Sequence, residues 1–454
     1  MDLRNYYGEK ADEKVLLGRI EKVKNAFYSH EKVKPERLFS SSGRAEILGN
    51  HTDHNHGKVL VAAISCDILA AVKKTDDGVI KICSEGYLPF TVNVNDLAVR
   101  EDEKGTSVAL TRGVAAAIKN RGENIGGFTA YLTSNVFGGA GVSSSAAYEV
   151  LIAEILNALY LDGKLSAVDK AIIAQYSENV YFGKPCGLLD QSGIAIGSLS
   201  ALDFTVPSAP AVKKLDMIKG YTLVITNTGG SHAALTEHYA AIRSEMEQVA
   251  EYFGEKVLRD VPKENFYADI KGVAKKISGR AALRAMHFYD ENERVDEAVA
   301  ALEKGDEKAF LSAVNGSGLS SLIRLQNCAV PGETEQRVVL GIELSREIIK
   351  RGAVRVHGGG FAGSILAVIA DEEVENYRAG NGQSFRQRKR VCRKRASARY
   401  CGNQINKLNA NAGLPKIGNP AFYMYDLHCV SKFILILLFR QTFTRYNYIL
   451  TVHR

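Results

Sequence analysis

The sequence predicts a globular protein that combines α-helices with β-strands, and three stretches carry this prediction. Residues 128–132 alternate as in a strand, residues 136–147 are rich in glycine, serine and alanine, and residues 148–156 have helical apolar spacing. Apolar side chains four, three and four apart predict an amphipathic helix near residues 12–29. The apolar run Val59–Ile64 reads as a further strand.

Length and composition bound the class of protein. A chain of 454 residues, 46% hydrophobic and 24% charged, is long enough for two or three soluble domains. The seven cysteines are scattered without a C-x-x-C pair, which favours reduced thiols in the cytoplasm. Residues 1–5 lack the apolar core of a signal peptide, and the apolar run Phe433–Phe439 is too short to span a bilayer. We therefore expect no membrane partner.

The charge is unevenly distributed along the chain. Residues 378–454 contain fifteen Lys or Arg and one acidic residue, a net +14, so the remaining chain carries −7 within the overall +7. Clustered basic residues can neutralise nucleic-acid phosphates. We nevertheless interpret nucleic-acid binding as the less favoured reading of this basic tail.

The stretch from Val136 to Ala147 predicts an anion-binding loop. A glycine loop that leads into a helix presents unpaired backbone N–H groups, and the helix dipole favours negative charge there. The simpler alternative is a serine N-cap on an ordinary helix. The stretch is neither a P-loop nor a nucleophile elbow, because it contains no Gly-Lys-Ser/Thr and no Gly-x-Ser-x-Gly.

Residues 51–56 read H-x-D-H-x-H, and this density of ligand types suggests a metal site. A zinc site is disfavoured because the stretch lacks helical periodicity and no second ligand cluster accompanies it. A polar loop that satisfies its own backbone explains the composition as well.

Taken together, several motifs resemble one family in collinear order over residues 13–378. Residues 43–55, GRAEILGNHTDHN, resemble the galactokinase signature G-R-x-N-L-I-G-E-H-T-D-Y. The serine loop and residues 356–364 are similar to the second and third motifs of the galacto-, homoserine, mevalonate and phosphomevalonate (GHMP) kinases. The third motif also fits G-x-G-x-x-G, but a strand-like run, residues 365–369, follows it where a dinucleotide site needs a helix. Residues 183–191, Glu178, Tyr239 with Arg243, and residues 284–294 extend the match.

This resemblance implies an α+β fold of two domains. Residues 1–205 would form a half like domain 2 of ribosomal protein S5, with the sugar signature and the phosphate loop. Residues 206–378 would form a ferredoxin-like half, and the active site would lie in the cleft between the two.

The resemblance also implies roles for individual residues, with ATP and Mg²⁺ as cofactors. Asp190 would orient and deprotonate the anomeric hydroxyl of the sugar, and Arg44 would keep it ionised. Ser145 and Glu178 would hold magnesium. The nucleotide phosphates would be held by Gly139, Ala140, Gly141, Val142, Ser143, Ser144 and Ser145. The sugar would be bound by Arg44, Asn50, His51, Asp53, Gly187, Asp190 and Tyr239.

The implied activity is ATP-dependent phosphorylation of galactose at C1. Two alternatives stay open: a galacturonate kinase and a sugar sensor with impaired catalysis. Galacturonate is considered because Asn50 replaces the family's glutamate and His54 its tyrosine. The Asn50 amide and a protonated His54 could then donate hydrogen bonds to a carboxylate at C6.

The basic tail, residues 379–454, departs from the family pattern. The family ends with a little more helix and a final strand, whereas here the composition changes abruptly. We interpret this as the product of a frameshift near codons 379–384, with a disordered tail and an exposed sheet edge in the second domain.

Overall fold

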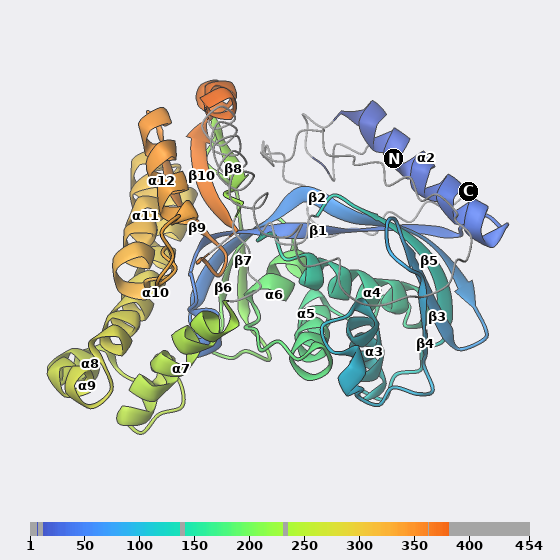
Figure 1. Ribbon diagram of the computed structural model, residues 1–454, viewed down its shortest axis with the longest axis horizontal. Helices are drawn as coiled ribbons and strands as arrows, with labels where there is room; N and C mark the ends of the chain where they lie inside the picture. Colours follow the sequence, from blue (N-terminus) through green and yellow to red (C-terminus); the bar gives the residue numbers. More distant parts are fainter. Residues whose placement is uncertain (1–6, 8–11, 137–140, 230–234, 362, 381–454) are drawn as a thin grey trace, which may run out of the picture.

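The computed structural model describes residues 7, 12–136, 141–229, 235–361 and 363–380 (Figure 1). Gly139 and Ala140 of the expected phosphate loop lie outside these residues, and so does the basic tail from residue 381 onward.

A large mixed sheet forms the first part of the fold. Its strand order is β4-β3-β5-β2-β6-β7, and β1 pairs separately with β2. The strands are β1 (Arg37–Leu48), β2 (Lys58–Thr75), β3 (Val79–Ser84), β4 (Phe90–Asn93), β5 (Gly127–Ser134), β6 (Leu199–Asp203) and β7 (Ala211–Leu215). The long strand β2 organises the sheet, because its first half pairs with β6, its second half with β5, and nearly its whole length with β1.

Helices cover both faces of this sheet. Helix α2 lies on one face and helices α3 to α6 lie on the other (Figure 1). The helical elements of this part are α2 (Glu13–Glu31), η1 (Asp53–Asn55), η2 (Glu101–Glu103), α3 (Ser107–Lys119), α4 (Ser144–Tyr160), α5 (Ala167–Tyr176), the π-helical turn η3 (Ser177–Phe182) and α6 (Leu189–Ile196). The side chain of Asp12 caps α2 by accepting from the backbone N–H groups of Lys14 and Val15.

A smaller antiparallel sheet, in the order β8-β10-β9, forms the second part. Its strands are β8 (Tyr221–Asn227), β9 (Gly352–His357) and β10 (Ser364–Ala370). The accompanying helical elements are α7 (Thr236–Tyr252), η4 (Leu258–Asp260), α8 (Lys263–Ala268), α9 (Ile270–Lys276), α10 (Gly279–Lys304), α11 (Glu307–Ser320), η5 (Ser321–Leu325), α12 (Arg337–Ile348) and η6 (Asp371–Glu373). Among the described residues, β8 and β9 are the edges of this sheet.

The structure confirms the elements that the sequence patterns predicted. The strand expected at residues 128–132 is β5, the amphipathic helix near residues 12–29 is α2, and the strand after the third glycine motif is β10. The large sheet continues through β7, beyond the boundary expected at residue 205. We therefore propose that the two domains, expected as 1–205 and 206–378, meet between Leu215 and Tyr221.

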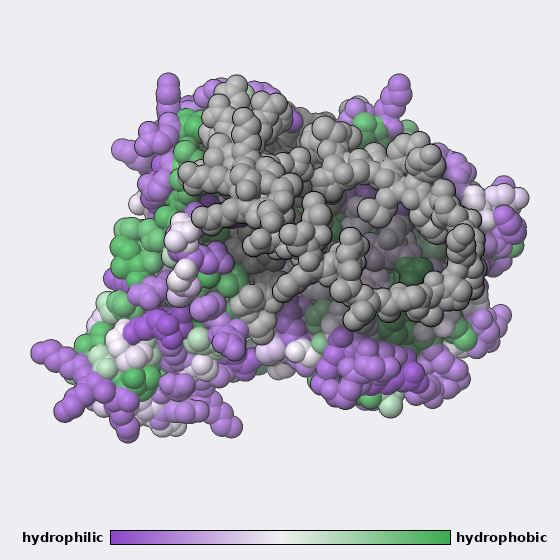
Figure 2. All heavy atoms as spheres, in the orientation of Figure 1, coloured by the Kyte–Doolittle hydropathy of each residue, from purple (hydrophilic) through white to green (hydrophobic). Residues whose placement is uncertain are grey.

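Figure 2 shows both hydrophilic and hydrophobic residues on the visible part of one face. Hydrophilic residues gather there over the region of α3 and β4. None of the helices within the described residues is long and apolar enough to cross a bilayer.

Phe128 tests how far the fold depends on the core of the large sheet. Its ring is fully buried on β5. We expect Phe128→Ala to lower the free energy of unfolding by about 3–5 kcal/mol, because the substitution leaves a cavity. Urea unfolding measures the loss. Tyr87→Ala, at a side chain that is 79% exposed, should stay within about 0.5 kcal/mol of the unmodified protein.

Candidate active site

An ion pair between Arg44 and Asp190 lies at the centre of the candidate site. Arg44 comes from β1, and Asp190 from the first turn of α6. The Arg44 Nε and Nη2 atoms both lie 2.7 Å from Oδ1 of Asp190. The Arg44 side chain is 5% exposed and that of Asp190 is 32% exposed, so the carboxylate faces the open side of the pair. The pair links a strand of the large sheet to a helix 146 residues later in the chain.

The environment keeps Asp190 ionised. Burial would raise the pKa of its carboxyl, but the positive charge of Arg44, the hydrogen bond from Ser143 and the charge of Lys184 lower the pKa below its ordinary value. An ionised carboxylate can accept a hydrogen bond from a substrate hydroxyl and orient it. Its lowered pKa makes it a weak base, so it suits a reaction that needs little proton transfer before the transition state.

The serine loop meets this pair directly. Arg44 Nη1 donates to the Gly141 carbonyl at 2.5 Å, and the Ser143 hydroxyl donates to Asp190 Oδ2. Ser143 precedes α4 with φ 59° and does not cap the helix with its side chain. The simpler alternative, a serine N-cap, does not hold for Ser143, because its hydroxyl binds the carboxylate of another element. Val142 is buried and anchors the loop in the core.

The third glycine motif closes over the same loop. Gly141 has φ +71°, and a Cβ there would lie 2.5 Å from Ser364 Oγ. A Cβ at Gly358 would lie 3.4 Å from the Gly141 carbonyl and 3.5 Å from Arg44 Nη2. Close approach therefore requires glycine at residue 141, whereas at Gly358 the requirement comes from its φ of +65°.

Ser145 and Glu178 form a second polar group beside the helix start. Ser145 Oγ donates to Glu178 Oε1 at 3.0 Å, and Lys184 Nζ lies 2.9 Å from the same oxygen. Gln191 Nε2 donates to Glu178 Oε2 at 2.7 Å. Burial would lower the pKa of Lys184, but Glu178 raises it above the ordinary value. A hydroxyl and a carboxylate oxygen fit the ligand preference of Mg²⁺, which takes few protein ligands and keeps several waters. In the part of the chain described, no group of three His, Cys, Asp or Glu residues could hold a metal, the 51–56 stretch included.

Four of the expected sugar-binding residues surround the ion pair. His51 Nε2 lies 3.0 Å from the Gly359 carbonyl, and Tyr239 donates to the Gly360 carbonyl at 2.8 Å. Asp53 Oδ2 accepts from the Leu189 N–H, next to Asp190, at 3.0 Å. Burial raises the pKa of the Asp53 carboxyl and lowers that of His51 to about 4, so the imidazole is neutral.

Gly187 stands where only glycine fits. A Cβ at this position would lie 1.8 Å from Asp53 Oδ2, well inside contact distance. The segment before Asp190 thus runs directly against the Asp53 carboxylate.

Asn50 requires a correction. Its side chain is fully buried, and Nδ2 donates to Glu46 Oε1 and to the Gly358 carbonyl, both at 2.7 Å. Its Oδ1 accepts from Asn327 and, at 3.4 Å, from Ser321. The amide has no remaining capacity for a sugar. The argument for galacturonate fails for the same reason, and because burial lowers the pKa of His54 well below 6.5 and leaves it neutral.

Sequence reasoning missed Glu46 and its partners. Glu46 is buried, lies 3.1 Å from Arg355 Nη2, and its N–H donates to His357 Nε2 at 3.1 Å. Burial raises the pKa of this carboxyl to about 7, against the lowering effect of Arg355 and Arg44. A signal was present in the signature itself: Glu46 stands where the family pattern has asparagine, four residues before Asn50 replaces its glutamate.

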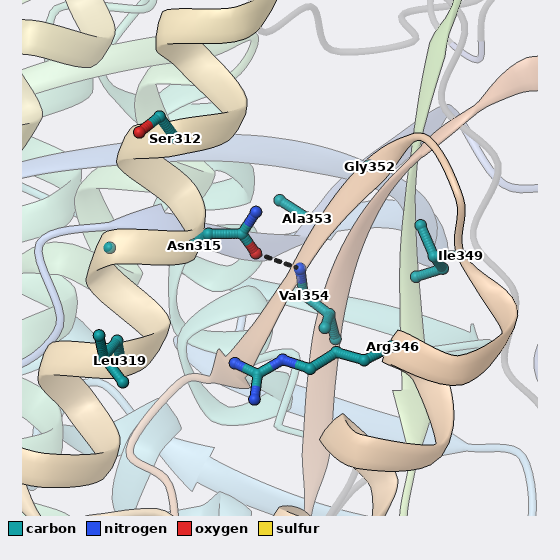
Figure 3. A pocket seen from close by; sticks show the side chains of 9 residues that line it. Ser312, Asn315, Leu319, Arg346, Ile349, Gly352, Ala353 and Val354 are labelled. Carbon is teal, nitrogen blue, oxygen red and sulfur yellow. Dashed lines mark hydrogen bonds between the residues drawn. The ribbon is translucent and has the colours of Figure 1, made fainter.

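A cavity away from the candidate site lacks the groups that this chemistry needs. A cavity of about 500 Å³ lies between α11, the end of α12 and β9 (Figure 3). Asn315, Leu319 and Arg346 point into it, and no carboxylate lines it. It therefore lacks the paired acid and base that phosphoryl transfer uses.

Comparison with known proteins agrees with this geometry. Residues 25–74 match the family model described as the galactokinase galactose-binding signature, and residues 109–198 match the GHMP kinases N terminal domain. A galactokinase from Streptomyces coelicolor is 33% identical over 342 residues, covering 74% of this chain and 85% of the relative.

Solved structures share the fold. The chain is similar to Lactococcus lactis galactokinase complexed with galactose, with a TM-score of 0.71 at 22% identity over 82% of this chain and 95% of that one. Streptococcus pneumoniae phosphomevalonate kinase gives a TM-score of 0.55 at 14% identity over 77% and 97% of the two chains. These likenesses define the fold as that of a GHMP kinase. The chain belongs to the galactokinase family within that class.

Ser143 offers a test of the site that does not require activity. We expect Ser143→Ala to raise the pKa of Asp190, because the variant removes a hydrogen bond that stabilises the charged carboxylate. Carboxyl chemical shifts followed by NMR through a pH titration measure the change. Ser144→Ala, one residue further along the loop, should leave the Asp190 titration where it was; equal shifts in both variants would contradict the assignment.

Proposed function

We propose that this protein transfers the γ-phosphoryl group of ATP to the C1 hydroxyl of galactose, giving galactose 1-phosphate and ADP. The observation that carries the proposal is the Arg44–Asp190 pair, which the serine loop contacts at both partners. Membership of the galactokinase family supplies the sugar and the phosphoryl donor. We further propose a cytoplasmic location, from the reduced-thiol pattern of the sequence.

Asp190 acts on the acceptor hydroxyl. Its Oδ2 side faces the serine loop, so a hydroxyl that donates to this carboxylate is held beside the phosphate-binding backbone. In phosphoryl transfer most of the rate comes from positioning and electrostatics, and the proton leaves late. A carboxylate of low pKa therefore suffices to orient the hydroxyl and take up its proton as the new bond forms.

Arg44 has two functions in this proposal. It keeps Asp190 charged, and it places a guanidinium beside the loop that holds the phosphates, where negative charge spreads in the transition state. Lys184 adds a second positive charge at Glu178. Backbone N–H groups at the start of α4 complete the anion site.

Ser145 and Glu178 would hold Mg²⁺ in this proposal. The ion would neutralise charge on the phosphate oxygens when it is bound. The chain's own contribution is to hold the Glu178 carboxylate in place through Lys184 on one oxygen and Gln191 on the other.

His51, Asp53, Gly187 and Tyr239 would form the walls of the sugar site. The His51 imidazole and the Tyr239 phenol are uncharged, and the pKa of the Asp53 carboxyl is raised. Such a site suits a neutral sugar with many hydroxyls.

Asp190→Ala tests the central assignment. We expect a folded protein whose transfer from ATP falls by at least about 100-fold, because the residue that orients and deprotonates the hydroxyl is missing. Radiolabelled ATP with a panel of hexoses, and NMR identification of the phosphorylated carbon, measure the result. Near-normal sugar 1-phosphate formation by Asp190→Ala would refute the role of Asp190. If the unmodified protein binds galactose but transfers no phosphoryl group, the protein is a catalytically silent sensor.

Glu178→Gln tests the proposed metal position. We expect the Mg²⁺ concentration for half-maximal activity to rise at least tenfold, since a neutral amide is a poorer ligand for a hard cation. The control is Lys170→Gln on α5, which removes a charge that pairs with Glu154 of α4 and should leave the Mg²⁺ requirement unchanged. An unchanged Mg²⁺ requirement in Glu178→Gln would exclude this carboxylate as a ligand.

A further inference from the structure

The family signature has a glutamate at the position of residue 50, where this chain has Asn50. This chain instead has a carboxylate four residues earlier, at Glu46. Asn50 is saturated by protein groups, as described above, and one of these is Glu46 Oε1. The two side chains are thus in direct contact at 2.7 Å, and between them they contain one amide and one carboxylate. The family pattern contains the same two groups in the reverse order.

Glu46 has bonding capacity that Asn50 lacks. Its Oε1 receives Asn50 and Arg355, at 2.7 Å and 3.1 Å. Among the described residues, both bonds are made by Oε1 and neither by Oε2. Oε2 is also not one of the fully buried side-chain atoms that lack a hydrogen-bond partner. Burial raises the pKa of the Glu46 carboxyl to about 7, so above that pH the group is ionised and accepts on both oxygens. Oε2 is therefore available to a hydroxyl that reaches it.

The strand places this carboxylate beside the reacting groups. Arg44 and Glu46 are two residues apart on β1 and pair in regular register with Ala63 and Val61 of β2. Their side chains therefore leave the same face of the strand, about 7 Å apart along it. That separation is comparable to the span of a hexose ring. A sugar whose C1 hydroxyl meets Asp190 thus extends its far hydroxyls toward Glu46.

We propose that Glu46, in place of residue 50, accepts a hydrogen bond from a hydroxyl on the half of the sugar opposite C1, at C4 or C6, and so determines specificity. This inference rests on the proposed function. Arg355 fixes the carboxylate from the other side and closes the seam between β1 and β9, since it also donates to the Ile47 carbonyl at 2.7 Å.

The proposal predicts a change in discrimination between sugars. In the unmodified protein, 4-deoxygalactose or 6-deoxygalactose should lose roughly 10- to 100-fold in kcat/KM relative to galactose, the size expected for a hydrogen bond to a charged group. In Glu46→Gln that ratio should shrink at least fivefold, because galactose loses its charged acceptor and the deoxy sugar has nothing to lose. The two deoxy sugars identify the hydroxyl.

A purely structural role for Glu46 gives a different result. If Glu46 only closes the ion pair with Arg355, the variant loses thermal stability and slows all sugars alike, and the proposal is overturned. Glu46→Asp keeps the charge but withdraws the carboxylate by one methylene, so it serves as the test if Glu46→Gln does not fold. In this variant the ratio of kcat/KM for galactose to that for the deoxy sugar should also shrink.

Glu291→Gln is the matched control. Glu291 is a fully buried acid on α10 that accepts from the Gly49 N–H at 3.0 Å. This variant should lose stability and keep the sugar ratio of the unmodified protein. If the unmodified protein transfers nothing to galactose, the proposed function fails. If it phosphorylates galactose and the ratio is unchanged in a folded Glu46 variant, only this inference fails.

Discussion

The geometry of the site depends on one side chain, the guanidinium of Arg44. Its planar group reaches Asp190 with two nitrogens and the Gly141 carbonyl with the third. A lysine could not make this set of contacts, because it offers a single charged centre. The Arg44 guanidinium therefore holds the Asp190 carboxylate in place and keeps it ionised. It also holds the serine loop at the Gly141 carbonyl. Since Arg44 lies on β1, the positions of Arg44, Asp190 and Gly141 relative to one another depend on the register of β1 on β2.

The seam between the two sheets adds a second constraint. Arg355 is fully buried on β9 and faces Glu46 on β1, with His357 accepting from the Glu46 N–H. Because Nε2 of His357 accepts this bond, its proton resides on Nδ1, which then donates to Ser364. A buried ion pair is a weak source of net stability, but removing one partner leaves an uncompensated charge. The contacts between β1 and β9 thus make separation of the two sheets unfavourable, and they hold the third glycine motif against the serine loop.

The sequence predicted most of the fold and much of the site, for physical reasons that differ between residues. Helix α2 and strand β5 follow from periodicity, which is a local property. Asp190, Glu178 and Gly141 could be named because they occur in motifs with a resemblance to the family. The partner of Ser143 could not, because its hydroxyl binds a residue 47 positions later instead of its own helix. Asn50 was misjudged for a related reason: its four contacts come from three separate segments, and no local pattern predicts that they converge.

The distribution of charge explains why the site suits a neutral sugar. Burial lowers the pKa of His51 to about 4 and those of His54, His287 and His357 below their ordinary value, so all four imidazoles are uncharged near neutral pH. Arg44 and Lys184 place positive charge near the described part of the serine loop, and both face a carboxylate. A carboxylate on the substrate would meet the carboxyl groups of Glu46 and Asp53, and the nearby guanidinium groups of Arg355 and Arg44 are already paired with Glu46 and Asp190. Hydroxyl groups meet no such cost, because each can donate to a carboxylate and accept from an imidazole. The electrostatics of the pocket thus select against the acidic sugar that the sequence alone had left open.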